Sequence, residues 1–135
     1  MKNIEKVESS KKLIALIYRS NIKVDGVKFL TDRKNPFQVG IHNRQKGVSL
    51  PPHIHRLDSL LTIKTVQEFL YVVDGKIRVT LFTEKGKKIT RKTLSPGDSI
   101  LIISGGHGVD FLEDARIIEL KQGPYPGPSK AKHFF

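Results

Sequence analysis

Short apolar runs separated by turn-forming residues recur along the chain at intervals of roughly ten residues. Several runs are rich in β-branched residues, and none has the length and periodicity of a long amphipathic helix. The run at 13–18 also fits a helical turn or two, but its length and composition favour a strand. This pattern predicts an all-β sandwich or barrel. The expected strands cover residues 13–18, 27–30, 37–42, 68–73, 76–82, 89–94, 99–103, 107–112 and 115–120.

Turn signals suggest how these strands are connected. Asp74-Gly75 separates two apolar runs and is the strongest hairpin signal in the chain. A second hairpin is expected around residues 85–87, and Asp25-Gly26 is a further hairpin signal before the strand at 27–30.

The chain has 135 residues and a mass of 15.2 kDa, so we expect a single domain over residues 1–135. Residues 123–135 hold three prolines and are expected to form an extended tail. The absence of cysteine excludes disulfides and thiolate metal sites. No apolar run is long enough to span a bilayer, and residues 1–10 do not resemble a signal peptide. We therefore expect a cytoplasmic protein with no membrane partner.

The net charge of +11 admits three interpretations: a nucleic-acid footprint, a solvated basic surface, or attraction of small anions. Lys and Arg are scattered, and no block of them exceeds two residues. Aromatic residues make up only 7% and are not interleaved with a basic stripe, so we reject nucleic-acid binding. A solvated basic surface is the preferred interpretation, although net charge does not separate it from attraction of small anions.

Histidine is scarce, and two of the five histidines, His53 and His55, are separated by a single residue. In an extended segment such residues project from the same face, about 7 Å apart at their Cα atoms. Pro51-Pro52 immediately before them favours an extended backbone. The two imidazoles are therefore either ligands that converge on one metal ion or exposed polar residues after a proline turn.

Two further residues extend this candidate site. Glu68 heads the clearest strand and points either to solvent or into the interior, and His107 follows the flexible pair Gly105-Gly106. Three imidazoles and one carboxylate would suit one divalent ion: Fe, Mn, Co or Ni with open positions, or Zn.

The order of these features over residues 40–122 resembles the two sequence motifs of the cupin superfamily. Gly47, His53, His55, Glu68 and Gly75 match the first motif, and Pro96-Gly97-Asp98 with His107 match the second. The resemblance implies a double-stranded β-helix, a cupin jelly-roll barrel, that is usually dimeric and carries a metal at its mouth. It also implies that the ligands are His53, His55, Glu68 and His107.

This sequence departs from the cupin pattern between the second histidine and the glutamate, where twelve residues replace the usual three or four. We interpret residues 56–67 as a longer hairpin arm or loop over the site, with Arg56 nearest the metal as a contact for an anionic substrate. His42 shares a strand face with Gln38 and Gly40, so it either lines the interior as a substrate-binding group or faces solvent.

Two functions are compatible with these residues. The first is a mononuclear metal enzyme of dioxygenase or isomerase type that acts on a small anionic metabolite. The second is a non-catalytic cupin that binds a sugar or nucleotide sugar, in a surface-polysaccharide context. In both cases the partner is a small molecule. We expect a homodimer, because an open jelly roll leaves edge strands that need covering.

Overall fold

The computed structural model describes residues 1–135 and is an all-β structure, with 42% of residues in strands and 3% in a helix. The predicted fold class is confirmed at this level. The strands form antiparallel sheets that do not close into a barrel. The chain divides into two compact units, residues 1–22 with 65–135, and residues 23–64.

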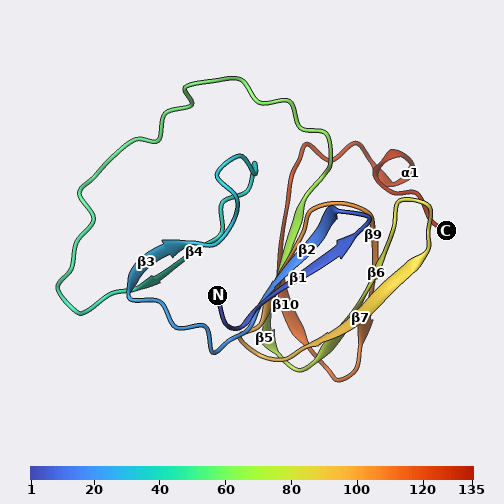
Figure 1. Cartoon of the computed structure of the whole chain (residues 1–135), viewed down its shortest axis with the longest axis horizontal. Helices are drawn as coiled ribbons and strands as arrows, with labels where there is room; N and C mark the ends of the chain where they lie inside the picture. The colour runs from blue at the N-terminus through green and yellow to red at the C-terminus, as the bar shows by residue number, and fades with distance from the viewer. The chain divides into compact units, whose positions relative to one another are not determined.

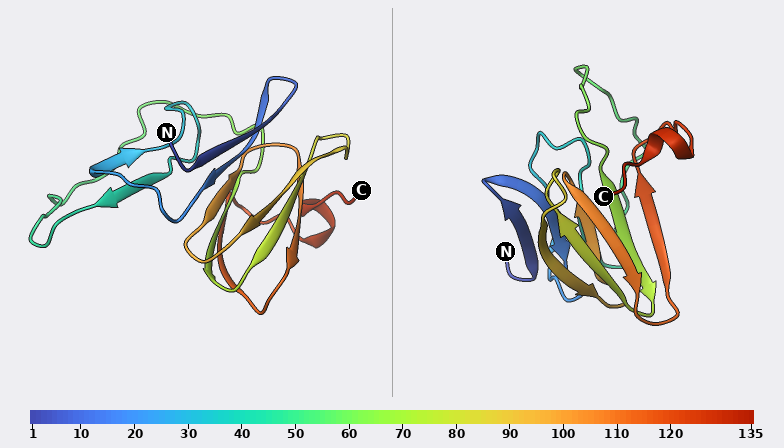
Figure 2. Two further views of the ribbon diagram at one scale, coloured as in Figure 1. Left: turned by 60° about the horizontal axis from the view of Figure 1, so that its bottom comes forward. Right: turned by 90° about the vertical axis from the view of Figure 1, so that its right-hand side faces the viewer.

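The larger unit contains two antiparallel sheets (Figures 1 and 2). The five-stranded sheet has the order β1-β2-β8-β5-β10, and the three-stranded sheet has the order β7-β6-β9. Its strands are β1 (Ile4–Ser9), β2 (Lys12–Tyr18), β5 (Glu68–Asp74), β6 (Ile77–Phe82), β7 (Lys88–Leu94), β8 (Ser99–Ile102), β9 (Gly106–Phe111) and β10 (Arg116–Lys121).

The core lies between these two sheets because each contributes alternate apolar residues to one cluster. Leu70 and Val72 of β5 come from the five-stranded sheet, and Val79 and Leu81 of β6 come from the three-stranded sheet. All four side chains are at most 1% exposed. The inner faces of the two sheets therefore share one apolar core.

The hairpin predicted at Asp74-Gly75 is wrong. β5 pairs with β8 and β10, whereas β6 pairs with β7 and β9, so the turn is a corner between the two sheets. Gly75 has a φ of 74°, and a Cβ atom there would overlap the backbone of Asp114. An Asp-Gly turn can therefore connect two strands of one hairpin or two strands of different sheets. Strand pairing is decided by burial of the apolar faces.

The other turn predictions have mixed outcomes. The hairpin around residues 85–87 is confirmed, since β6 pairs with β7 and Thr83 N donates to Lys87 O at 2.8 Å. The hairpin at residues 25–26 is wrong, because no strand precedes that turn as a partner. The strand β1 was not predicted. It pairs with β2 through a turn at Ser10-Lys11, where both residues have positive φ without any glycine to signal it.

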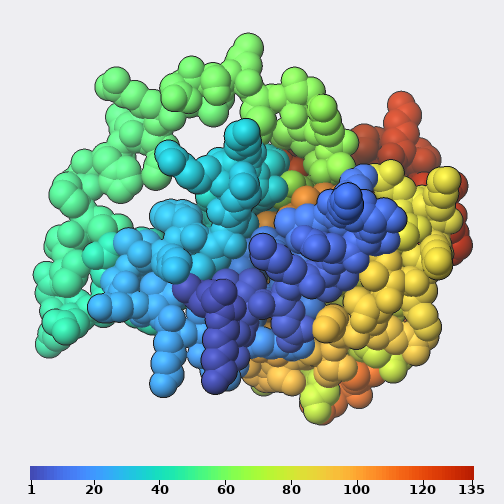
Figure 3. All heavy atoms as spheres, viewed as in Figure 1, coloured from blue at the N-terminus to red at the C-terminus, as the bar shows by residue number.

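The smaller unit contains one two-stranded sheet formed by β3 (Gly26–Phe29) and β4 (Gly40–Asn43). The strand predicted at 37–42 therefore begins later and ends one residue later. Residues 44–67, which begin in this unit, have no regular secondary structure, so of the two forms predicted for residues 56–67, hairpin arm or loop, the structure has the loop. Ile54 and Leu60 in this loop are 88% and 97% exposed. Figure 3 shows the loop in green.

The tail at 123–135 is extended apart from one helical turn, α1 (Pro128–Ala131). This is the only helix in the structure. The structure accordingly contains no helix with the length and apolar character needed to cross a membrane.

Candidate functional site

Glu68 and His107 lie on the inward-directed faces of opposite sheets in the larger unit, Glu68 half-buried and His107 exposed. Glu68 shares its strand face with the core residues Leu70 and Val72. His107 pairs directly with Leu81, a core residue on β6, so the two side chains lie on the same face. The alternation of the strands thus directs a carboxylate and an imidazole toward each other from the two sheets.

The two side chains are in contact with each other. His107 Nε2 lies 3.3 Å from Glu68 Oε2, and the side chains are 29% and 13% exposed. Two of the four residues predicted as metal ligands are therefore brought together across the sandwich. A carboxylate shielded to this degree next to an imidazole provides donor atoms for a metal ion, or an acid–base pair for a bound molecule.

Two residues of the neighbouring strand β10 extend this pair. Lys121 pairs with Glu68 in the sheet, and Glu119 pairs with Leu70. Lys121 Nζ lies 3.9 Å from Glu119 Oε1. Burial opposes ionisation of Glu68, but hydrogen bonds with His107 and Glu119 lower the pKa of Glu68 to about 2. The hydrogen bond with Glu68, together with burial, raises the pKa of Glu119 above its usual value. Glu68 and Glu119 are therefore two hydrogen-bonded carboxyl groups, of which Glu68 ionises more readily.

Glu119 and Lys121 were not predicted as site residues. A signal was present, because Ile117, Glu119 and Lys121 alternate on one face of an expected strand. The sequence does not show that this face lies beside Glu68, since that depends on the register between β10 and β5.

His53 and His55 belong to the smaller unit and lie in the loop rather than on a strand. Their ring centroids are 4.9 Å apart in an edge-on arrangement, so the alternate spacing does bring the two imidazoles together. His53 Nδ1 lies 2.8 Å from the Pro51 carbonyl oxygen and donates to it. This contact leaves Nε2 of His53 as the nitrogen available to a ligand.

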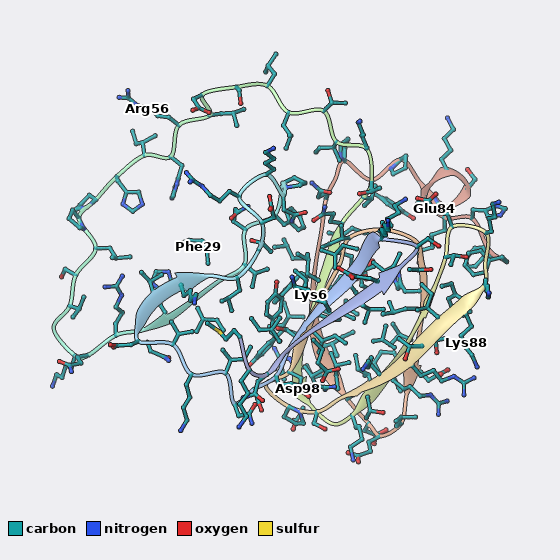
Figure 4. The ribbon with its side chains drawn as sticks, viewed as in Figure 1. Lys6, Phe29, Arg56, Glu84, Lys88 and Asp98 are labelled. Atoms are coloured by element: carbon teal, nitrogen blue, oxygen red, sulfur yellow. The ribbon has the colours of Figure 1, made fainter.

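The two predicted substrate-binding residues are both exposed. His42 lies on β4, where its ring is 6.5 Å from the ring of Phe29. Arg56 lies in the loop (Figure 4). Both belong to the smaller unit.

Asp98, which carries part of the resemblance to the second cupin motif, has a structural role in a turn. Its carboxylate accepts hydrogen bonds from Ser20 N at 2.8 Å, from Ser95 N at 3.0 Å and from Arg19 Nη1 at 3.1 Å. Asp98 precedes β8, whereas Glu68 pairs with Ile102 at the other end of that strand. The turn therefore fixes the entry of β8 and lies away from the candidate site.

No family model, curated protein or solved structure matches this chain. Within neither unit do three or more His, Asp or Glu side chains gather in an arrangement that would hold a metal ion.

Proposed function

We propose that this chain is a metal-binding protein of the cupin type that holds one divalent ion and acts on a small anionic metabolite. The observation that supports the proposal is the 3.3 Å contact between Glu68 and His107, which approach each other from opposite sheets. Unrelated core packing would not require a carboxylate and an imidazole at this position, because buried charges are costly unless they are paired or used.

Glu68 and His107 would hold the ion, and His53 and His55 would complete the ligand set. Imidazole nitrogens and one carboxylate oxygen suit Fe, Mn, Zn, Ni or Co. The ion would supply polarisation of a carbonyl or enolate oxygen, which fits dioxygenase or isomerase chemistry. Arg56 and His42 are the residues proposed to bind the substrate.

The second candidate is a non-catalytic cupin that binds a sugar or nucleotide sugar. The observation that favours it is the presence of Glu119 and Lys121 beside Glu68, because adjacent carboxyl and ammonium groups can accept from and donate to several hydroxyl groups. Under this proposal the metal is structural or absent.

Metal content separates the two candidates. We expect about one equivalent of divalent ion per chain in protein purified without a histidine tag or chelator, measured by elemental analysis. His53→Ala and His107→Ala should each abolish stoichiometric binding, and His133→Ala should leave it unchanged as the matched loss of one imidazole.

Binding should weaken as the pH falls through the imidazole range, because ligands must be unprotonated. Full metal content in both variants would place the site elsewhere, and metal-free wild-type protein that binds neutral sugars would favour the second candidate.

A further inference from the structure

The strand β10 has one edge without a partner strand. It is the last strand of the five-stranded sheet and pairs with β5 on one side only. Figure 2 shows it in orange-red at one side of the two sheets, and five of its six residues are exposed. A free edge of this kind can accept a further strand through its backbone N–H and C=O groups.

The hydrogen bonds around β5 show which backbone groups of β10 point to the free edge. Gln122 N donates to Gln67 O at 3.2 Å. Because hydrogen bonding alternates along an antiparallel pair, the backbone groups of Glu119 and Lys121 point away from β5. The other side of β5 agrees with this phase, since Val72 N donates in the opposite direction, to the residue before β8, at 3.0 Å.

The other three edges carry features that oppose pairing with a second copy. β1 has a bulge between Val7 and Glu8, and β9 contains two glycines. β7 contains three basic residues and no acidic residue, so two such edges would repel each other. β10 instead carries charges of both signs, and its apolar residues Ile118 and Leu120 are 54% and 59% exposed.

The charges of β10 select one antiparallel register for a second copy. Residues with outward-pointing backbone groups in one copy must lie opposite such residues in the other. A twofold axis at Leu120 meets this condition and places Glu119 opposite Lys121 of the second copy, and Lys121 opposite Glu119. An axis at Glu119 or at Lys121 would instead place two like charges opposite each other. The axis at Leu120 therefore gives two attractive charge pairs and one apolar contact.

We propose that this chain forms a twofold homodimer by antiparallel pairing of β10 with β10 of a second copy, with Leu120 on the axis and Glu119 opposite Lys121. The five-stranded sheets of the two copies then form one continuous sheet. The interface consists of a single strand pair, so we expect a weak dimer that dissociates in the micromolar range. This inference goes beyond the proposed function, and it depends on neither candidate because it involves no metal and no ligand.

The test measures assembly of the full chain by sedimentation velocity over a range of micromolar concentrations. Wild-type protein should form a species of twice the chain mass of 15.2 kDa. Glu119→Lys places two lysines opposite each other at both symmetric contacts, and Lys121→Glu does the same with two glutamates. Each change should weaken dimerisation by about tenfold, since like charges replace opposite charges at two cross-strand pairs.

An equimolar mixture of these two variants provides the decisive measurement. One copy then has lysine at both positions and the other has glutamate at both, so every charge pair in the mixed dimer is attractive. The mixture should dimerise about as tightly as wild type, and so should the single chain that carries both exchanges. The controls are Glu8→Lys on β1 and Lys88→Glu on β7, which make the same charge changes at exposed residues of other edges and should leave dimerisation unchanged.

Dimerisation that is lost in each single variant and recovered on mixing supports the proposal, and the recovery also shows that both variants fold. A mixture that stays monomeric would overturn it, because Glu119 and Lys121 would then not face each other. A wild-type monomer throughout the micromolar range, or a dimer that neither change weakens, would overturn it as well. Metal content enters none of these outcomes, so the dimer and the proposed function stand or fall separately.

Discussion

At the scale of single residues, Glu68 and His107 illustrate how much of the site the sequence can predict. Strand alternation alone placed Glu68 on the same face as Leu70 and Val72, and the sandwich puts that face inward. His107 was found because it is a scarce residue type after a glycine pair. Glu119 was missed, because its proximity to Glu68 depends on register between strands that are far apart in the sequence.

Outside the candidate site, the ionised carboxylate of Glu5 contributes to the stability of the fold. This carboxylate accepts from Arg19 Nε at 2.7 Å and from Lys92 Nζ at 2.8 Å, which connects β1 to the residue just after β2 and to β7. The hydrogen bond with Arg19, followed by that with Lys92, lowers the pKa of Glu5 below its ordinary value.

A lowered pKa in the folded state means that Glu5 stabilises the fold above its unfolded pKa of about 4.3, and that this contribution is lost as the pH falls through its folded value. Glu5→Gln should therefore reduce the free energy of unfolding at pH 7 by about 1 kcal/mol or less, because the pair is partly exposed. The difference from wild type should shrink progressively below about pH 4.3. Urea denaturation across this pH range is the measurement. Glu8→Gln, on the same strand, is the control, and a deficit that persists unchanged at pH 2 would contradict the prediction.

At the scale of elements, apolar alternation predicted most strands but not their partners. The strand over residues 68–73 was found nearly in full, yet its partners are β8 and β10 rather than the following strand. The physical reason is that adjacent apolar runs can form a hairpin or pass around a corner into a second sheet. That choice depends on which packing buries more apolar surface in the whole fold.

The strand β8 is buried on both faces, which distinguishes it from its neighbours. Ile100 pairs with Leu70 and faces the core, so Leu101 faces the opposite side of the sheet, and both are 0% exposed. A near-continuous apolar sequence is typical of such a strand. The outer side of the sheet at β8 is therefore covered, whereas Leu120 on β10 remains 59% exposed.

We expect Ile100→Ala and Leu101→Ala to lower the free energy of unfolding by similar amounts, about 2–4 kcal/mol each, because both remove fully buried methylenes. Leu120→Ala should change it by about 0.5 kcal/mol or less. Chemical denaturation of the three variants under one condition makes the comparison. A loss for Leu101→Ala no larger than for Leu120→Ala would show that the outer face is not packed in solution.

At the scale of the whole molecule, the single domain, the homodimer and the jelly-roll topology stay predictions. The five-stranded sheet has β1 and β10 as edges, and the three-stranded sheet has β7 and β9. Unpaired edges are the feature from which a dimer was expected. The division into two units could not be predicted from composition, because residues 44–67 contain eight large apolar residues, which the sequence alone does not distinguish from core residues although all eight are exposed.

The net charge of +11 is a property of the whole molecule with a direct consequence for ligands. A basic surface raises the local concentration of small anions, and a bound cation would attract their oxygens further. We therefore expect small carboxylates or sugar phosphates to raise the melting temperature of metal-loaded protein more than neutral sugars of similar size. Differential scanning fluorimetry at matched ligand concentrations measures this.

The controls separate long-range attraction from local recognition. A purely electrostatic contribution should decline as salt rises from about 0.01 M to 0.15 M, where the screening length falls from about 30 Å to about 8 Å. Specific binding by Arg56 predicts a smaller shift in Arg56→Ala than in Arg44→Ala, an exposed arginine just after β4. The shift should also shrink in metal-free protein. Equal shifts for neutral and anionic ligands, independent of metal and salt, would contradict the anion preference and favour a binding module for neutral sugars.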